Sequence, residues 1–178
     1  MSEGIYRKAG SSTNVQKLIT SLRKDAFSVQ ITRTEFNEHD VSTALKRFFR
    51  ELPEPLMGKF AVSFLSVSEM KSEPDKITAY RELLERLQVV EYQTLKKLLG
   101  HLHFIQTQRG INKMKAENLA MVFGPTLMQP NSNENTYHID SRDNDVIAEL
   151  ILNYKKLYAL SPDEIVRRTL MKLSFEFY

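Results

Sequence analysis

The sequence predicts an all-α fold, on three observations. Apolar residues recur at intervals of three and four along most of the chain, as on one face of a helix. No series of alternating apolar and polar residues indicates a set of strands. Prolines and glycines stand where the helical patterns begin or end. With 178 residues the chain has the size of one domain that can bury its own core.

Two amphipathic helices are predicted in the first third of the chain. The first carries its apolar stripe at Val15, Leu18, Ile19 and Leu22. Residues 26–38 lose this period and are predicted to form a loop or an extended segment. The second helix carries its stripe at Val41, Ala44, Leu45, Phe48, Phe49 and Leu52. Asp40 is placed to cap this helix, and Pro53 and Pro55 should end it.

The middle of the chain continues the helical pattern. Residues 59–70 carry it weakly, and Pro74 lies where the first turn of a further helix is expected. A longer helix faces inward with Leu95, Leu98, Leu99, Leu102 and Ile105. The pattern over residues 118–123 predicts a short buried helix, which should end at Gly124 and Pro125.

The last part of the chain divides into a loop, a helix and an extension. Residues 129–144 are polar and without period, which predicts an exposed loop. A helix is expected over residues 146–157, and Ser161 begins a Ser-Pro-Asp-Glu run that is typical of a helix start. We therefore expect a helical domain over residues 1–159 and a C-terminal helical extension or linker over residues 160–178.

Composition argues against several classes of function. Without cysteine there are no disulfides, thiolate-bound metals or cysteine nucleophiles. No apolar stretch reaches the ~18 residues of a membrane span, and the N-terminus lacks the apolar core of a signal peptide, so we expect a cytoplasmic protein. The net charge of +3 comes from 25 basic and 22 acidic residues that are scattered along the chain. This charge fits an ordinary surface or a mild attraction to acidic partners, and not the clustered bases of a nucleic-acid interface.

The sequence contains no constellation of a self-contained enzyme. The HExxH, GxSxG and phosphate-binding loop motifs are absent. His101 and His103 are two residues apart, so on a helix they point about 200° apart and cannot share a metal ion. We therefore expect no metal site. Any catalysis would complete an active site that belongs to a partner protein.

One candidate for such a role is an arginine near the N-terminus. In the run GIYRKAG, Arg7 lies between Gly4 and Gly10. The backbone freedom of glycine suits a tight loop that presents the arginine at a fixed geometry. A single arginine between glycines fits an ordinary loop equally well.

Two further segments carry polar residues among apolar ones. Lys46 and Arg50 are one helical turn apart, on the face opposite Leu45 and Phe48. The helical wheel thus buries Phe48 and turns both cations outward, toward an acidic target or simply toward solvent. Asn118 lies within the apolar run NKMKAENLAMVFGPTLM. A buried amide there either ties two loops together or serves a partner.

Together and in this order, the three segments resemble the Rho-type GTPase-activating (RhoGAP) domain. That family has an arginine loop of the form GIYRxSG, a helix of the form LKxxLRELPEPL, and then NKMxxxNLAxVFGPxL. The present chain reads GIYRKAG, LKRFFRELPEPL and NKMKAENLAMVFGPTLM. The resemblance covers residues 3–158 and is closest to multidomain proteins that join Arf- and Rho-directed GAP domains. Two departures are Ala9, where the family usually has serine, and the expected lack of the helical segment that precedes the loop in the family.

The resemblance implies a RhoGAP-like helical domain that stimulates GTP hydrolysis by a Rho-family small GTPase in its GTP-bound state. Arg7 corresponds to the arginine finger that enters the partner's active site. Lys46 and Arg50 correspond to the basic pair on the GTPase-facing helix. Asn118 corresponds to the amide at the partner's switch region, and Pro53 lies near the same groove. The four polar residues are expected to line one shallow face.

The resemblance also implies what the domain does not supply. The partner GTPase binds Mg²⁺ and GTP, so the domain needs no cofactor of its own, and recruitment to membranes would fall to flanking domains. Two other functions stay open at this point. One is a GTPase-binding module without catalysis, and the other is a structural helical scaffold that associates with lipids.

Overall fold

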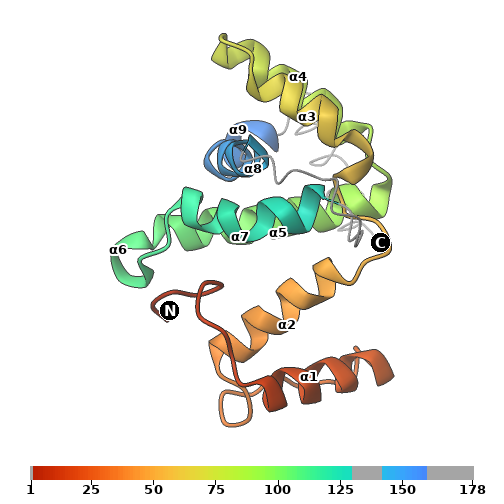
Figure 1. Cartoon of the computed structure of the whole chain (residues 1–178), viewed down its shortest axis with the longest axis vertical. Coiled ribbons are helices and arrows are strands. Elements are labelled where there is room, and N and C mark those ends of the chain that lie inside the picture. Colours follow the sequence, from red (N-terminus) through yellow and green to blue (C-terminus); the bar gives the residue numbers. More distant parts are fainter. Residues whose placement is uncertain (1, 130–141, 160–178) are drawn as a thin grey trace, which may run out of the picture.

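The computed structural model describes residues 2–129 and 142–159, and this part of the chain is helical without strands (Figure 1). The prediction of an all-α fold is therefore confirmed. The helices are α1 (Ser12–Lys24), α2 (Glu38–Arg50), the 3-10 turn η1 (Gly58–Phe60), α3 (Ala61–Ser68), α4 (Glu73–Glu85), α5 (Val89–Thr107), α6 (Arg109–Asn112), α7 (Ala116–Met128), α8 (Arg142–Leu152) and α9 (Tyr154–Leu157).

The described helices are stacked along the long axis of the molecule (Figure 1). Helices α3 and α4 lie at one end and α1 and α2 at the other, with α5, α7 and α8 between them. The N-terminal segment runs between α2 and the layer of α5 and α7. It can therefore be held from both sides.

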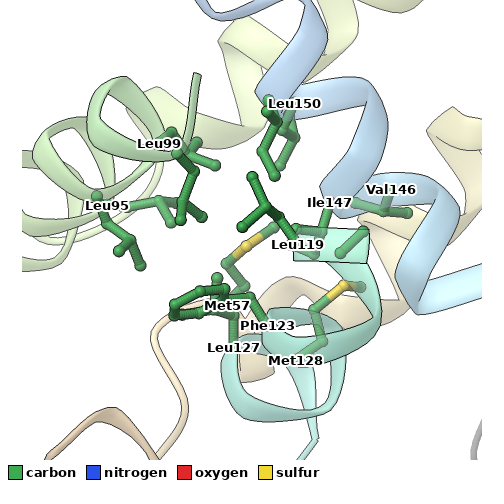
Figure 2. Close-up of a cluster of buried hydrophobic side chains, with 14 of the residues drawn as sticks. Met57, Leu95, Leu99, Leu119, Phe123, Leu127, Met128, Val146, Ile147 and Leu150 are labelled. Atoms are coloured by element: carbon green, nitrogen blue, oxygen red, sulfur yellow. The ribbon is translucent and has the colours of Figure 1, made fainter. Parts of the chain in front are cut away.

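The main core lies where α7 packs against α8 and α5 (Figure 2). The inward-facing residues predicted for α5 are all buried in it, from Leu95 to Ile105. Gly124 lets α7 and α8 approach closely, because a Cβ atom there would collide with the side chain of Asn144. The side chains labelled in Figure 2 are Met57, Leu95, Leu99, Leu119, Phe123, Leu127, Met128, Val146, Ile147 and Leu150.

Helix α7 is longer than the sequence predicted. It continues through Gly124 and Pro125 to Met128, so the expected stop at these two residues is wrong. A proline usually clashes with the Cβ of the residue before it, and glycine has none. The helix loses the hydrogen bond that the missing N–H of Pro125 would make, but it packs against both α8 and α5, which offsets that loss. The Thr126 hydroxyl donates to the Val122 carbonyl in the same turn, at 3.1 Å.

Helix α2 begins earlier than predicted and has a different cap. The side chain of Asn37 accepts hydrogen bonds from the backbone N–H groups of His39 and Asp40, at 2.8 and 3.0 Å. Asp40 is the third helical residue, and its carboxylate accepts a bond from the Asn37 N–H at 3.1 Å. The two residues thus form a reciprocal capping box, and the prediction that Asp40 is the cap itself is wrong.

The prediction that Phe48 is buried is also wrong, since 55% of its surface is exposed. Helix α2 packs on two sides, with Ala44 against α1 and Phe49 in the main core. A wheel with one apolar stripe does not describe a helix that is packed on two sides. Phe48 lies between the two contacts and lines an apolar groove between α1 and α2.

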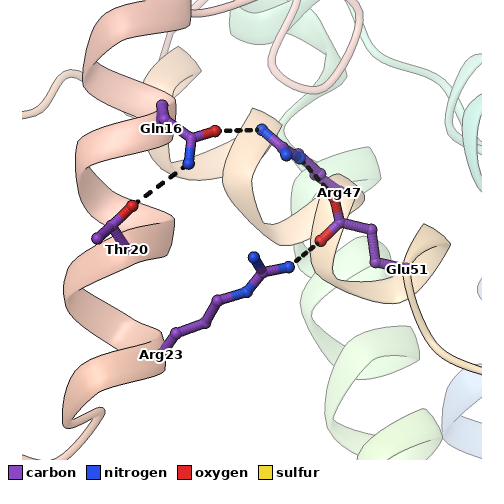
Figure 3. A network of polar contacts seen from close by, with 5 residues as sticks. All are labelled: Gln16, Thr20, Arg23, Arg47 and Glu51. Atoms are coloured by element: carbon purple, nitrogen blue, oxygen red, sulfur yellow. Dashed lines mark hydrogen bonds and ion pairs between the residues drawn. The ribbon is translucent and has the colours of Figure 1, made fainter.

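A polar network on the surface joins α1 to α2 (Figure 3). Glu51 accepts from Arg23 of α1 and from Arg47 of α2, both at 2.6 Å. Arg47 also donates to Gln16 at 2.9 Å. The charged side chains are between 37% and 65% exposed to solvent, so each pair is worth under about 1 kcal/mol. The small apolar cluster beneath them contributes more to holding α1 in place.

The C-terminal predictions are confirmed in part. Most apolar residues of the expected 146–157 helix are buried, with Tyr154 half-buried and Leu152 exposed, and the helix is divided at Asn153 into α8 and α9. The expected loop over residues 129–144 ends earlier, because α8 already begins at Arg142. Residues 130–141 and the extension over 160–178, with its predicted helix start at Ser161, lie outside the described residues. No helix in the described ranges is long and apolar enough to cross a membrane.

Candidate functional site

The arginine loop, residues 4–10, begins with a tight turn that presents Arg7. Gly4 takes a φ of +72° and Tyr6 a φ of +69°, both in the left-handed region. The N–H groups of Arg7 and Lys8 both donate to the Gly4 carbonyl, at 2.9 and 2.8 Å. This compact turn leaves the side chain of Arg7 exposed at its tip.

The first half of the arginine loop is anchored in the main core. The Gly4 N–H donates to the backbone carbonyl of Asn112 at 2.8 Å. Ile5 and Tyr6 are buried, and the Tyr6 ring meets the edge of Phe123 on α7 with 5.0 Å between ring centres. The residue directly before Arg7 is therefore a fixed part of the core.

The second half of the arginine loop is anchored on α2. The Gly10 N–H donates to the Thr43 hydroxyl at 3.0 Å, and the Ser11 N–H donates to the Asp40 carboxylate at 2.7 Å. The approach is so close that a Cβ on Gly10 would lie 2.5 Å from the Asp40 Cα. Gly10 is thus required for close contact, and its own backbone angles are ordinary.

Asp40 is a buried carboxylate whose negative charge is matched by hydrogen bonds. Burial raises its pKa, but the bonds donated by Asn14, Asn37 and Ser11 outweigh that effect, so the pKa lies below its ordinary value. The Asn14 amide donates to it at 3.0 Å. One side chain thus joins the end of the arginine loop, α1 and the start of α2.

Lys46 bonds to the arginine loop itself. Its Nζ donates to the backbone carbonyl of Tyr6 at 2.6 Å, one residue before Arg7. Burial lowers the pKa of Lys46, and the nearby charge of Arg50 lowers it further. Lys46 is half-buried while Arg50 is exposed, so the prediction that both cations point outward is wrong for Lys46. The two cations do lie close together, as the spacing predicted.

Two asparagines of the NKM segment have different roles. Asn112 is wholly buried, donates to the Ile105 carbonyl at 2.7 Å and accepts from the Met114 N–H at 2.8 Å. It is the amide that ties loops together, a role the sequence suggested only for Asn118. Asn118 is half-buried, and its Oδ1 accepts from the Lys115 N–H at 3.3 Å at the start of α7.

The predicted site is brought together in part. One hydrogen bond joins Lys46 to the backbone next to Arg7, and the charge of Arg50 acts on Lys46. Pro53 is exposed in the turn after α2, and the described contacts do not join it or Asn118 to the arginine loop. The assignments of Arg7, Lys46, Arg50, Asn118 and Pro53 to a GTPase interface therefore stay predictions.

Some residues of this region were not predicted from the sequence. Met121 is 67% exposed one turn after Asn118, so α7 presents a methionine and an amide on one face. Its place in an apolar run suggested core, because exposure cannot be read from hydrophobicity alone. Tyr6 and His101 are joined by a hydrogen bond of 2.8 Å although 95 positions separate them. A sequence pattern cannot reveal such a pair.

A family model and several relatives match this chain. The model of the RhoGAP domain matches residues 1–132. The mouse "Arf-GAP with Rho-GAP domain, ANK repeat and PH domain-containing protein 3" is 31% identical over 91% of this chain and 10% of its own length. The chicken "Rho GTPase-activating protein 15" is 32% identical over 90% of this chain and 34% of its own length. The chain thus spans about a tenth to a third of these curated relatives.

Two solved structures share the fold. The BH domain of Graf, the GTPase regulator associated with focal adhesion kinase, superposes with a TM-score of 0.78 at 31% identity. The match covers 90% of this chain and 86% of that one. Human Rho GTPase activating protein 15 also gives a TM-score of 0.78, at 30% identity, over 89% of this chain and 76% of that one.

Proposed function

The chain belongs to the RhoGAP domain family, and from this premise we propose that it stimulates GTP hydrolysis by a Rho-family small GTPase through Arg7, supplied in trans. The observation that carries the proposal is the exposed guanidinium at the tip of a loop whose two halves are bonded to different helices. An arginine held in this way can enter another protein's active site without first being ordered.

The chemistry of GTP hydrolysis explains why one arginine suffices. Negative charge spreads over the phosphoryl oxygens in the transition state, so catalysis depends mainly on positioning and charge stabilisation. A guanidinium is always protonated and offers several donors in one plane, which match those oxygens. An arginine supplied in trans accelerates hydrolysis by about 10³–10⁵-fold. The partner supplies GTP and Mg²⁺, and Arg7 supplies the added positive charge.

The other residues act in docking. Arg50 offers an exposed cation next to Lys46, and α7 offers Asn118 beside the exposed Met121. In our proposal this mixed polar and apolar surface contacts the switch region of the GTP-bound partner, with Pro53 at its margin. Lys46 has a second task, because its Nζ also fixes the loop that carries Arg7. In this proposal the domain needs no cofactor of its own and acts in the cytoplasm, and any recruitment to membranes falls to flanking domains.

The test is a single-turnover measurement with a GTP-loaded Rho-family GTPase and saturating domain. Arg7→Ala should lower the stimulated rate by about 10³-fold or more, while affinity for the GTP-loaded partner stays largely unchanged. Arg7→Lys should restore little, because an ammonium cannot reproduce the planar contact. Lys8→Ala is the matched control, since it removes the neighbouring exposed cation of the same loop.

The alternatives predict other results. Stimulation that is equal with alanine at position 7 would refute the arginine finger. A wild-type domain that binds GTP-loaded partners without stimulating hydrolysis would be a non-catalytic binding module. A domain that neither binds nor stimulates any Rho-family member would be a structural scaffold.

A further inference from the structure

We propose that His101 is a positioning residue for this reaction: through the hydroxyl of Tyr6 it holds the backbone turn that presents Arg7. The proposal rests on the proposed function of Arg7. It assigns a role to a helix that carries none of the predicted site residues, because His101 lies on α5.

The argument begins with the backbone of Tyr6. Its φ of +69° lies in the left-handed region, which a bulky side chain seldom adopts because its Cβ crowds the following peptide. Such a conformation persists only when surrounding contacts hold it in place. Tyr6 directly precedes Arg7, so its backbone angles set the direction in which the Arg7 segment leaves the core.

The contacts that hold Tyr6 act at both ends of the residue. At the backbone end, the Lys46 Nζ donates to the Tyr6 carbonyl at 2.6 Å. At the side-chain end, the hydroxyl lies 2.8 Å from the His101 Nε2, and the two rings meet edge to face with centres 5.9 Å apart. Between these two ends, the Phe123 ring packs against the Tyr6 ring. Rotating Tyr6 into an ordinary conformation would break the hydrogen bonds at both ends.

The chemistry of the pair fixes the direction of the hydrogen bond. Tyr6 is only 2% exposed, and burial raises the pKa of its phenol, so the hydroxyl stays protonated and must find an acceptor. Burial also lowers the pKa of His101, so its imidazole is neutral near pH 7. The hydroxyl therefore donates to Nε2, and the imidazole proton lies on Nδ1. Tyr6 and His101 both line a groove next to the arginine loop, and the charged side chains that line this groove are Arg33 and Glu38.

Another histidine on the same helix provides a matched control. His103 lies two residues further along α5, so it points to a different side of the helix. Its Nδ1 lies 2.8 Å from the Ile151 carbonyl on α8, away from the arginine loop. A general effect of losing a histidine from α5 would appear at both positions. An effect through the arginine loop would appear only at His101.

The experiment measures single-turnover hydrolysis at saturating domain, at a temperature where circular dichroism shows every variant folded. Tyr6→Phe, which removes only the hydroxyl, and His101→Ala should each lower the stimulated rate about three- to tenfold, the range expected from losing one neutral hydrogen bond. Their combination should lower it no further than either alone. His101→Gln, which keeps an acceptor, should recover part of the rate, and His103→Ala should stay near wild type.

Three outcomes would overturn this proposal while leaving the proposed function of Arg7 intact. Rates that are unchanged by both Tyr6→Phe and His101→Ala would show that the hydrogen bond does not position Arg7. A His103→Ala domain as impaired as His101→Ala would indicate a general effect on α5. Tyr6→Phe should also have no effect on an Arg7→Ala domain, and a persisting loss there would show an action that bypasses Arg7. A fourth outcome would overturn both proposals, namely full stimulation by the Arg7→Ala domain. If Arg7→Ala abolishes stimulation while Tyr6→Phe and His101→Ala do not lower it, this inference fails and the proposed function stands.

Discussion

Two irregular segments flank α1, and they are held in different ways. The arginine loop, residues 4–10, bonds to the backbone at Asn112 and to side chains of α2 and α5. The segment over residues 25–36 bonds mainly to itself, through residues two to four positions apart. Phe36 and the partly buried Val29 anchor it in the small α1–α2 cluster, and an ion pair on the surface joins Glu35 to Lys17 of α1 at 2.7 Å. Phe27 is fully exposed.

The difference shows what fixes the position of a loop side chain relative to the rest of the fold. Bonds within a loop give it a local shape but do not fix that shape relative to the rest of the fold. Bonds to several helices do, and in the arginine loop they occur before and after Arg7. The loop bonds that reach other elements should therefore matter for stability and activity, and exposed side chains of the other segment should not.

The largest effect on stability is expected at Gly10. Gly10→Ala would place a Cβ 2.5 Å from the Asp40 backbone, so the loop must move away from α2. We expect a loss of about 3 kcal/mol in the free energy of unfolding, near the upper end for overpacking. Gly110→Ala is the matched control, since nothing lies within 4 Å of a Cβ there. Urea unfolding of both variants tests this, and equal stabilities would show that the loop is not in close contact with α2.

A smaller effect that depends on pH is expected at Asp40. Its pKa is lower in the folded protein than in the unfolded chain, so its contribution to stability is fully present above the unfolded pKa of about 3.9. That contribution disappears as the pH falls through the folded pKa. Asp40→Asn should cost about 2 kcal/mol at pH 7, because one amide oxygen cannot accept all the bonds that reach the carboxylate.

The pH profile provides the control for that prediction. Wild type and Asp40→Asn should converge in stability only as the pH falls through the folded pKa, which lies below about 3.9, since the carboxyl is then protonated in both folded and unfolded wild-type chains. Urea unfolding at several pH values measures this. A difference that stays constant from neutral to acid pH would mean that the charge of Asp40 contributes nothing.

How well the sequence predicted the buried residues of a helix depends on how many sides of that helix are packed. Helix α5 packs on the core along one stripe, so the period of its leucines predicted its buried face correctly. Helix α2 packs on two sides, and there the same method misplaced Phe48. Pro125 was predicted to end a helix because proline normally breaks one. The sequence does not show that α5 and α8 pack against α7 and support it through this point.

The candidate site follows the same rule. Arg7 and its glycines were found because the tight turn is local in sequence. The residues that hold the turn come from distant segments, and the sequence gives no sign that Asn112 would accept from Gly4 or that His101 would meet Tyr6. The motifs indicated which side chains are offered to a partner. Only the fold shows which side chains keep them in place.

The smallest effect is expected at Phe27, and it tests the comparison from the other side. Its side chain is fully exposed, and its backbone N–H donates to the carboxylate of the nearby Asp25 at 3.0 Å, a bond that Phe27→Ser leaves in place. Since the ring buries nothing, its loss should change the free energy of unfolding by no more than about 0.5 kcal/mol. The stimulated hydrolysis rate should equal that of wild type, because no bond joins Phe27 to the arginine loop within the described part of the chain. Urea unfolding and single-turnover hydrolysis measure the two quantities. A loss of stability well above 0.5 kcal/mol, or a slower stimulated reaction, would mean that this segment is held as firmly as the arginine loop, and the contrast between the two would be lost.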